Sequence, residues 1–289
     1  MDENYFKGWA KPGPIIPKSK AKDLARPGET LDALCGHYRI FQLEKGHRFS
    51  TDDFLVAWYG TTWCPCPRTV LDLGSGIGAV GMLAAWRLHG ARFVTVEAQE
   101  TSVALARRSC QYNELEDRYE IRHGDLRDPN LIRPDEKFDL IMGSPPYFPI
   151  GSGIEGDHPQ KIACRFELRG SVVDYCRVAS EHLNLGGFFS IIFPIAQESQ
   201  LKRVEAAARE AQLTIVRSRP IVFKEGEPPL LSLFGMMRSD HLPESFRDQT
   251  WKEPPLVIRK ARRPDTGGSP DDSVHEEYRA LKLALGFPP

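Results

Sequence analysis

The chain has 289 residues, of which 41% are hydrophobic and 27% are charged, an ordinary mixture for a globular protein with one large domain. A formal net charge of −1 excludes a general attraction to nucleic acid, so any basic contact surface must be local. No apolar run is long enough to span a bilayer, and the first residues carry no secretory signal, so we expect a cytoplasmic protein with no membrane partner.

The first 28 residues, rich in proline and lysine, predict a flexible leader before a single domain over residues 29–289. That domain divides into an N-terminal segment 29–68, a core 69–240, and a C-terminal strand and helix within 241–289. In the first segment, residues 37–43 are strand-like, Phe49-Ser-Thr-Asp52 resembles a helix N-cap, and residues 53–59 follow as a helix. Cys64 and Cys66, in the proline-broken connector 61–67, have poor zinc spacing, so the scattered cysteines predict reduced thiols and no metal site.

From residue 69, short apolar runs alternate with longer helical stretches. The runs predict strands at residues 69–73, 92–97, 119–125, 138–143, 188–193, 213–217 and 230–237. The stretches between them predict helices at 79–89, 100–113, 172–185 and 197–211, the third ended by Gly186-Gly187. Strands that alternate with helices predict an α/β fold: a Rossmann-like, seven-stranded, mostly parallel sheet with helices on both faces and a small N-terminal extension.

The first predicted strand of the core ends in Asp72-Leu-Gly-Ser-Gly-Ile-Gly78, directly before a helix. Gly74, Gly76 and Gly78 remove Cβ atoms where a ligand must lie against the backbone, and the helix N-terminus offers unpaired N–H groups beside it. Strand, glycine turn and helix in this order predict a ligand cradle at the carboxyl edge of a parallel sheet.

Two carboxylates follow the next two predicted strands, at the same edge of the sheet. Glu97 lies 23 residues past Gly74, where a carboxylate can accept hydrogen bonds from both hydroxyls of a ribose; the alternative is an exposed strand-end charge. Asp125, in His123-Gly-Asp-Leu, would meet an adenine through its side chain or through the next backbone N–H; the alternative is a helix cap. These features fit NAD and S-adenosylmethionine nearly equally.

The fourth predicted strand ends in Gly143-Ser-Pro-Pro-Tyr-Phe148, which favours a methyl donor over a hydride carrier. Pro145 and Pro146 fix φ and remove two donors, so the backbone of this turn offers only carbonyls. The Pro145 carbonyl and the Ser144 hydroxyl can accept the hydrogens of an exocyclic amine, and Tyr147 can stack on the ring that carries it, for about 1–3 kcal/mol. We therefore predict a catalytic turn from Ser144 to Tyr147 that works by positioning, with no dedicated base. The alternative is a proline-rich loop with a core tyrosine.

With these motifs the chain resembles the bacterial tRNA adenine N6-methyltransferases that act on adenosine 37 of valine tRNA, in the class I methyltransferase superfamily. Residues 72–78 are similar to D-x-G-x-G-x-G, and residues 144–148 are similar to N-P-P-Y-[FY]. The likeness runs from Glu29 to about Pro289 through the segments Glu29-Thr-Leu-Asp, Phe41-Gln42, Phe49-Ser-Thr-Asp52, Tyr112-Asn113-Glu-Leu, His123-Gly-Asp-Leu, Arg165-Phe-Glu167, Leu256-Val-Ile-Arg259 and Tyr278-Arg-Ala-Leu.

The resemblance implies an S-adenosylmethionine-dependent enzyme that methylates an exocyclic amine of RNA, with adenine N6 of tRNA as the expected target. It implies that the cofactor is held by Asp72, Gly74, Gly76, Gly78, Glu97 and Asp125. It also implies that Gln42, Arg48 and Asp52 line the cofactor mouth, and that the turn from Ser144 to Tyr147 holds the target base, with Ser144 also beside the cofactor.

Ser144 departs from the family pattern, which has asparagine at this position. A hydroxyl reaches less far than an amide oxygen, and serine here resembles cytosine N4 DNA methyltransferases, although residues 148–289 leave no room for their target-recognition region. Two alternatives stay open. One is a protein glutamine N5-methyltransferase, for which residues 1–68 are too short to form the usual helical domain, and the other is a non-catalytic relative that binds cofactor or RNA.

Basic residues near the carboxyl end are candidates for contact with RNA phosphates, and no obligate protein partner is indicated. They are Arg217, Arg219 and Lys224 beside one loop, and the cluster Arg259-Lys-Ala-Arg-Arg263. If these residues lie near the ligand cradle, they would make RNA binding sensitive to salt. The alternative is that they are ordinary charged residues exposed to solvent.

Overall fold

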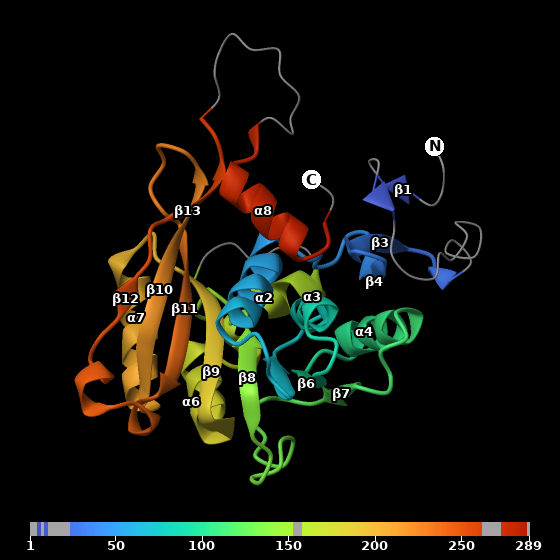
Figure 1. The fold of residues 1–289 in the computed structure, drawn as a ribbon. Coiled ribbons are helices and arrows are strands. Elements are labelled where there is room, and N and C mark those ends of the chain that lie inside the picture. The colour runs from blue at the N-terminus through green and yellow to red at the C-terminus, as the bar shows by residue number, and fades with distance from the viewer. Residues whose placement is uncertain (1–4, 7–8, 11–23, 153–157, 262–272, 288–289) are drawn as a thin grey trace.

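The computed structural model describes residues 5–6, 9–10, 24–152, 158–261 and 273–287 (Figure 1). Most of the leader predicted over residues 1–28 lies outside these ranges. Its described part contains β1 (Tyr5–Phe6) and β2 (Trp9–Ala10), which pair antiparallel. No helix in the described ranges is long and apolar enough to cross a membrane.

A nine-stranded sheet forms the centre of the molecule, in the order β12-β10-β11-β9-β8-β5-β6-β7, with β13 also beside β10 (Figure 1). Its strands are β5 (Thr69–Leu73), β6 (Arg92–Glu97), β7 (Tyr119–His123), β8 (Phe138–Gly143), β9 (Leu183–Pro194), β10 (Leu213–Lys224), β11 (Leu231–Arg238), β12 (Trp251–Lys252) and β13 (Leu256–Arg259). Only β11 runs antiparallel to its neighbours, β9 and β10. The predicted mostly parallel sheet is therefore confirmed, and two short strands at the β10 edge extend the seven that were predicted.

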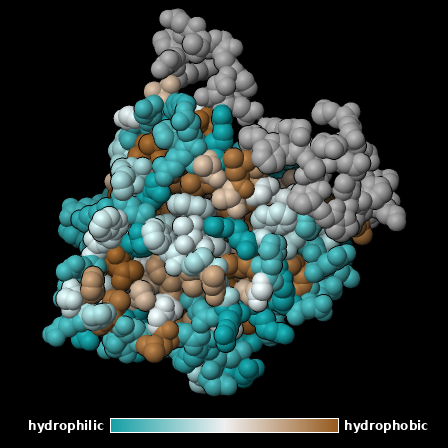
Figure 2. Space-filling model, viewed as in Figure 1, coloured by the Kyte–Doolittle hydropathy of each residue, from teal (hydrophilic) through white to brown (hydrophobic). Residues whose placement is uncertain are grey.

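Helices cover both faces of this sheet, as predicted. They are α2 (Thr51–Trp63), α3 (Ala79–Arg87), α4 (Glu100–Tyr112), α6 (Val172–His182), α7 (Glu198–Glu210) and α8 (Glu276–Ala284). A further short helix, α5 (Pro159–Arg165), contributes no residue to either buried cluster. The central strand β5 is apolar on both sides, because Val70 packs in the same cluster as α2 and α3, whereas Leu71 packs in the cluster that contains α6 and α7. The face shown in Figure 2 carries hydrophobic residues in scattered patches among hydrophilic ones.

The predicted end of the helix over 172–185 is wrong. The helix α6 ends at His182, and Gly186-Gly187 lies inside β9, where the pairing with β8 jumps from Phe138–Leu183 to Leu140–Phe188. Gly186 has φ +72°, which a residue with a side chain rarely adopts, so the glycine permits an irregularity in a strand instead of ending a helix.

The helix predicted over 53–59 is longer than expected and runs from Thr51 to Trp63. The Thr61 and Thr62 hydroxyls donate to the carbonyls of Ala57 and Trp58, and the preceding residues 54–59 are buried in the core. Tertiary packing therefore overrides the weak helix propensity of the threonines in the predicted connector.

A hairpin of β3 (Glu29–Cys35) and β4 (Tyr38–Leu43) precedes α2, and only its second strand was predicted. Asn113, at the end of α4, fixes the hairpin by accepting from the Arg39 N–H and donating to the Arg39 carbonyl, both at 2.8 Å. The hairpin therefore holds residues 44–50 next to the carboxyl edge of the sheet, where β5 and β6 end.

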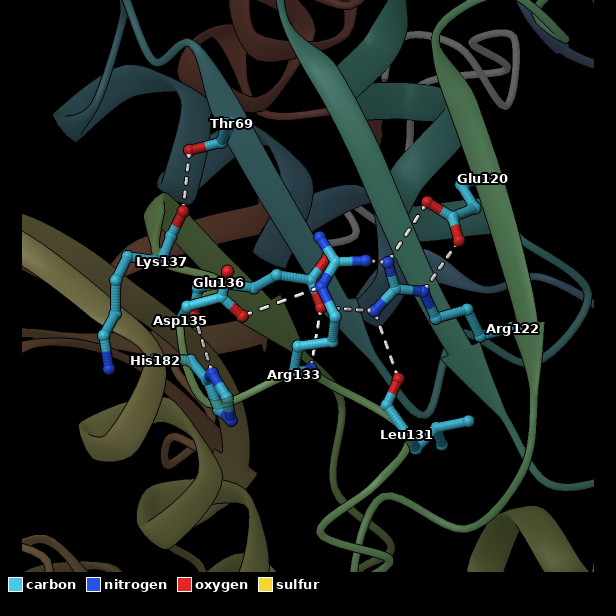
Figure 3. A network of polar contacts seen from close by, with 9 residues as sticks. All are labelled: Thr69, Glu120, Arg122, Leu131, Arg133, Asp135, Glu136, Lys137 and His182. Atoms are coloured by element: carbon cyan, nitrogen blue, oxygen red, sulfur yellow. Dashed lines mark hydrogen bonds and ion pairs between the residues drawn. The ribbon is translucent and has the colours of Figure 1, made fainter.

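A polar network ties the loop before β8 to β7 (Figure 3). Arg122 donates two hydrogen bonds of 2.7 Å to the carboxylate of Glu136, whose oxygen also accepts from the Arg133 N–H. The Glu136 side chain is only 14% exposed, and Arg122 lowers its pKa to about 2. A depressed pKa stabilises the fold above the pKa of the unfolded chain, near 4.5, and this contribution is lost as pH falls through about 2.

We expect Glu136→Gln to lower the free energy of unfolding at pH 7 by about 2–3 kcal/mol, with the difference from wild type shrinking towards pH 2. Urea denaturation at pH 7 and at low pH measures this difference. Asp135→Asn is the matched control, because the Asp135 side chain is 82% exposed. An equal loss of stability in both variants, or a loss that does not change with pH, would contradict a stabilising ion pair between Arg122 and Glu136.

Candidate functional site

The three glycines of the turn between β5 and α3 all have a left-handed backbone. Gly74, Gly76 and Gly78 have φ values of +61°, +55° and +90°. A Cβ on Gly74 would lie 1.8 Å from the hydroxyl oxygen of Tyr175, so this glycine is needed for packing. A Cβ on Gly76 would meet nothing within 4 Å, so the backbone there is open to a ligand.

Glu97, at the end of β6, is bound to this turn. Its carboxylate accepts the Gly76 N–H at 2.8 Å and the Gln99 N–H at 2.6 Å. The residue is 6% exposed, and burial raises its pKa in spite of these bonds. Glu97 is therefore a buried, oriented carboxylate whose remaining lone pairs are available to a ligand.

A cavity of about 670 Å³ opens at this edge of the sheet, within the size range of small-molecule sites. It brings together most of the predicted site residues: Arg48, Asp52, Gly74, Gly76, Glu97, Ser144, Pro145, Pro146 and Tyr147. Four predicted residues do not line it: Gln42, Asp72, Gly78 and Asp125.

Asp72 and Gln42 are buried outside the cavity and hydrogen-bond to residues that position its lining. Asp72 is 1% exposed and accepts the Gly81 N–H of α3 at 2.9 Å, which fixes the glycine turn against the helix. Gln42 is also 1% exposed; it accepts the Phe49 N–H and donates to Asp32. Asp32 in turn pairs with Arg48 at 2.8 Å, so Gln42 acts on the cavity through the loop that carries Arg48.

Asp125 is not among the residues that line the cavity, and it forms an ion pair with Arg127 at 2.6 Å. It also accepts the Arg127 N–H, which makes it the cap of the turn that follows β7. Its neighbours Gly124 and Leu126 line the cavity instead. A ligand in the cavity is therefore better placed to contact the backbone beside Asp125 than the Asp125 carboxylate.

The turn after β8 lines the same cavity as the glycine turn. The Tyr147 hydroxyl donates to Asp52 at 2.8 Å, and the ring packs edge-on against Phe193 at 5.7 Å between centroids. Burial raises the pKa of the phenol well above its usual range, so Tyr147 is neutral and donates. The first turn of α2 thus fixes the orientation of Tyr147.

Asp53 is a lining residue that the sequence analysis did not single out. It accepts the Ser50 N–H at 2.8 Å and completes a capping box at the start of α2. Burial raises its pKa to about 7. The sequence Ser50-Thr-Asp-Asp53 contains the capping signal, but nothing in it places the carboxylate against a cavity.

Ser75 and three cations also line the cavity and were missed. The Ser75 hydroxyl is buried without a hydrogen-bond partner, which marks a position where a ligand can supply one. The cations are Lys161, Arg165 and Arg169, on α5 and on the short helix η1 (Glu167–Arg169) that follows it. They belong to a stretch for which no helix was predicted.

The basic residues predicted to contact RNA are largely engaged elsewhere. Arg217 pairs with Glu253 at 2.9 Å and lies over the Trp63 ring, and Arg219 pairs with Glu277. Neither lines the cavity. Residues 262 and 263 of the predicted basic cluster lie outside the described residues.

The cavity fits a ligand that carries an adenosine. It offers an open backbone at Gly76, the unpartnered Ser75 hydroxyl, and the oriented carboxylate of Glu97. Across the cavity, the Ser144 to Tyr147 turn provides acceptors and an aromatic ring for a second, planar group. Two ligands can therefore meet between two rigid turns.

Comparison with known proteins gives a consistent result. The Methyltransferase small domain family matches residues 56–162. A protein named tRNA1(Val) (adenine(37)-N6)-methyltransferase from Porphyromonas gingivalis is 30% identical over 179 residues, which cover 60% of this chain and 69% of the relative. A protein of the same name from Vibrio cholerae is 26% identical over 226 residues, covering 77% of this chain and 87% of the relative.

Among solved structures, a predicted O-methyltransferase from Agrobacterium tumefaciens matches with a TM-score of 0.58 and 21% identity. The match covers 82% of this chain and 98% of that one. It supports the class I methyltransferase fold.

Proposed function

Because the chain belongs to the tRNA1(Val) (adenine(37)-N6)-methyltransferase family, we propose that it transfers a methyl group from S-adenosylmethionine to an exocyclic amine of RNA. The target is adenine N6 in tRNA, and the enzyme acts in the cytoplasm. One observation carries the proposal: Glu97 with the glycine turn, and the Ser144 to Tyr147 turn, line one cavity.

Glu97, Ser75 and the backbone of Gly76 would hold the cofactor. The carboxylate of Glu97 accepts from ribose hydroxyls, and the Ser75 hydroxyl gains the partner that it lacks. The Gly124 to Leu126 backbone borders the same cavity and can meet the adenine edge. When bound there, S-adenosylmethionine supplies an electrophilic methyl group on a sulfonium centre.

The Ser144 to Tyr147 turn positions the amine that accepts the methyl group. An exocyclic amine is a poor nucleophile because its lone pair is delocalised into the ring. Hydrogen bonds from its two N–H groups to the Ser144 hydroxyl and the Pro145 carbonyl favour a tetrahedral nitrogen with a localised lone pair. Tyr147, fixed by Asp52, holds the base by stacking, and the surplus proton leaves to solvent.

The substrate class is tested with purified protein and labelled S-adenosylmethionine, offered bulk tRNA, DNA and a protein extract in parallel. We expect label in tRNA. Label in protein but not in RNA would support a glutamine methyltransferase instead, and label in no fraction would support a non-catalytic relative.

We expect Ser144→Asn to retain or raise the rate of transfer to tRNA, because an amide oxygen can accept the same amine hydrogen and reaches farther than a hydroxyl. Ser144→Ala is the control and removes the acceptor, so we expect it to lower kcat by roughly tenfold or more. Complete loss of activity in Ser144→Asn would show that the turn serves a different substrate geometry.

A further inference from the structure

We propose that Lys161, Arg165 and Arg169 form a phosphate-contact surface at the mouth of the cavity, for the RNA backbone on either side of the target nucleotide. We call these residues the α5 cationic surface. The inference rests on the proposed function and names the part of the chain that receives the RNA.

The three cations share their exposure, their position at the cavity, and the absence of an ion pair within the described residues. All three are exposed and line the cavity, and none forms an ion pair with any residue in the described ranges. Lys161 and Arg165 are four residues apart on α5 and therefore lie on one side of it. In contrast, several other arginines are neutralised, including Arg48 by Asp32 and Arg203 by Glu167.

The surface is adjacent to the turn that holds the target base. Arg165 lies 5.6 Å from the centroid of the Phe148 ring, the residue that follows Tyr147. The Phe148 N–H donates to the Arg165 carbonyl at 3.1 Å, and the Phe148 carbonyl accepts from Glu167. These backbone bonds fix α5 and η1 to the catalytic turn. A phosphate bound by Arg165 would therefore have a fixed position relative to the base.

The opposite wall of the mouth is also close to these cations. His47 lines the cavity on the loop before α2; burial lowers its pKa, and the nearby charges of Lys161 and Arg165 lower it further. Arg169 lies close enough to Glu97 to favour its charged form. These three cations therefore border the cavity that both turns line.

A polyanion is the kind of ligand whose charge complements these three cations. The whole chain has a net charge of −1, so three unneutralised cations at one opening are a local exception. A base that reacts inside a cavity must leave its stack, and its flanking phosphates then remain at the entrance. Guanidinium groups bind phosphate oxygens in a bidentate manner, which gives position without reading sequence.

The test measures binding of an unmodified valine tRNA transcript by the full chain over a salt series. The variant Lys161→Gln/Arg165→Gln should bind tRNA about tenfold or more weakly near 0.1 M salt, and reduce the slope of log K against log salt by about 1.5. Adding Arg169→Gln should reduce both further. Arg165→Lys alone should keep the slope, because it keeps the charge.

The matched control is Arg68→Gln/Arg92→Gln, which removes two exposed cations at the start of β5 and β6, the opposite edge of the sheet. It should bind tRNA like wild type. A slope for Lys161→Gln/Arg165→Gln equal to that of wild type or of this control would overturn the inference.

Cofactor affinity, measured by calorimetry, shows whether each variant is folded, and should change little in both double variants. If wild type binds tRNA through the α5 cationic surface but transfers no methyl group, the inference stands and the proposed function fails. If wild type methylates tRNA while the double variant keeps its salt slope, the proposed function stands and the inference fails. If wild type does not bind tRNA, both fail.

Discussion

Replacing Tyr147 with alanine is expected to lower kcat for tRNA methylation by about 10²-fold or more. The ring would stack on the target base, and its hydroxyl is fixed by a 2.8 Å hydrogen bond to Asp52. Both the stacking and the fixed orientation are lost in the variant. The glycine turn and Glu97 do not contact this side chain, so the dissociation constant of the cofactor should stay within about threefold of wild type.

Single-turnover kinetics and a separate cofactor titration distinguish these two effects. Tyr147→Phe is the informative companion, because it keeps the ring and removes the hydroxyl that bonds to Asp52 and contacts Ser144. We expect it to lose roughly tenfold in rate, with most of the base stacking retained. A large loss of cofactor affinity in Tyr147→Ala would instead make Tyr147 a structural residue.

Replacing Glu97 with alanine is expected to weaken cofactor binding by about 10²-fold or more, from the loss of two hydrogen bonds to a charged acceptor at about 1.5–3 kcal/mol each. The variant also leaves the N–H groups of Gly76 and Gln99 without their acceptor, so the glycine turn loses part of its order. Calorimetric titration with S-adenosylmethionine measures the change.

Glu97→Gln keeps the volume of the side chain and one acceptor oxygen, so its affinity should lie between those of wild type and Glu97→Ala. Glu100→Ala is the control, because Glu100 is exposed on the first turn of α4. Unchanged cofactor affinity in Glu97→Ala, in a variant that melts as wild type does, would exclude Glu97 from the cofactor site.

Local signals predict the parts of the site that depend on one short stretch. The glycine turn follows from a buried strand, three glycines and a helix, and the structure has β5, this turn and α3 in that order. Glu97 follows a second apolar strand, and parallel strands bring their carboxyl ends to one edge. The position of Ser144 to Tyr147 beside them follows from the adjacency of β8 to β5.

Residues whose placement depends on tertiary contacts were not predictable in the same way. Whether Asp125 faces the cavity depends on Arg127, and a hydrogen bond between neighbours in a turn competes with a ligand for the same carboxylate. Gln42 was expected at the cofactor mouth, but its amide is consumed by Asp32 and the backbone of Phe49. Asp125 and Gln42 both have side chains suited to binding a ligand, but their hydrogen bonds are made to other residues of the chain.

The location of free charge also could not be predicted from the sequence. Arg217 and Arg219 looked available near the carboxyl end, but their partners Glu253 and Glu277 come from segments distant in the chain. Arg165 appeared only as part of a family motif. Its exposure at the cavity mouth follows from the bonds between Phe148 and residues 165–167, which bring α5 and η1 to the catalytic turn.

The central claim is that this cavity methylates adenine N6 in tRNA. It is tested most directly by incubating the enzyme with S-adenosylmethionine and an unmodified valine tRNA transcript, then digesting the RNA for nucleoside mass spectrometry. We predict N6-methyladenosine with wild type and none with Tyr147→Ala, and no product from a transcript with guanosine at position 37. A methylated cytosine, a methyl group on another adenine, or unmodified RNA with an enzyme that binds its cofactor would contradict the account.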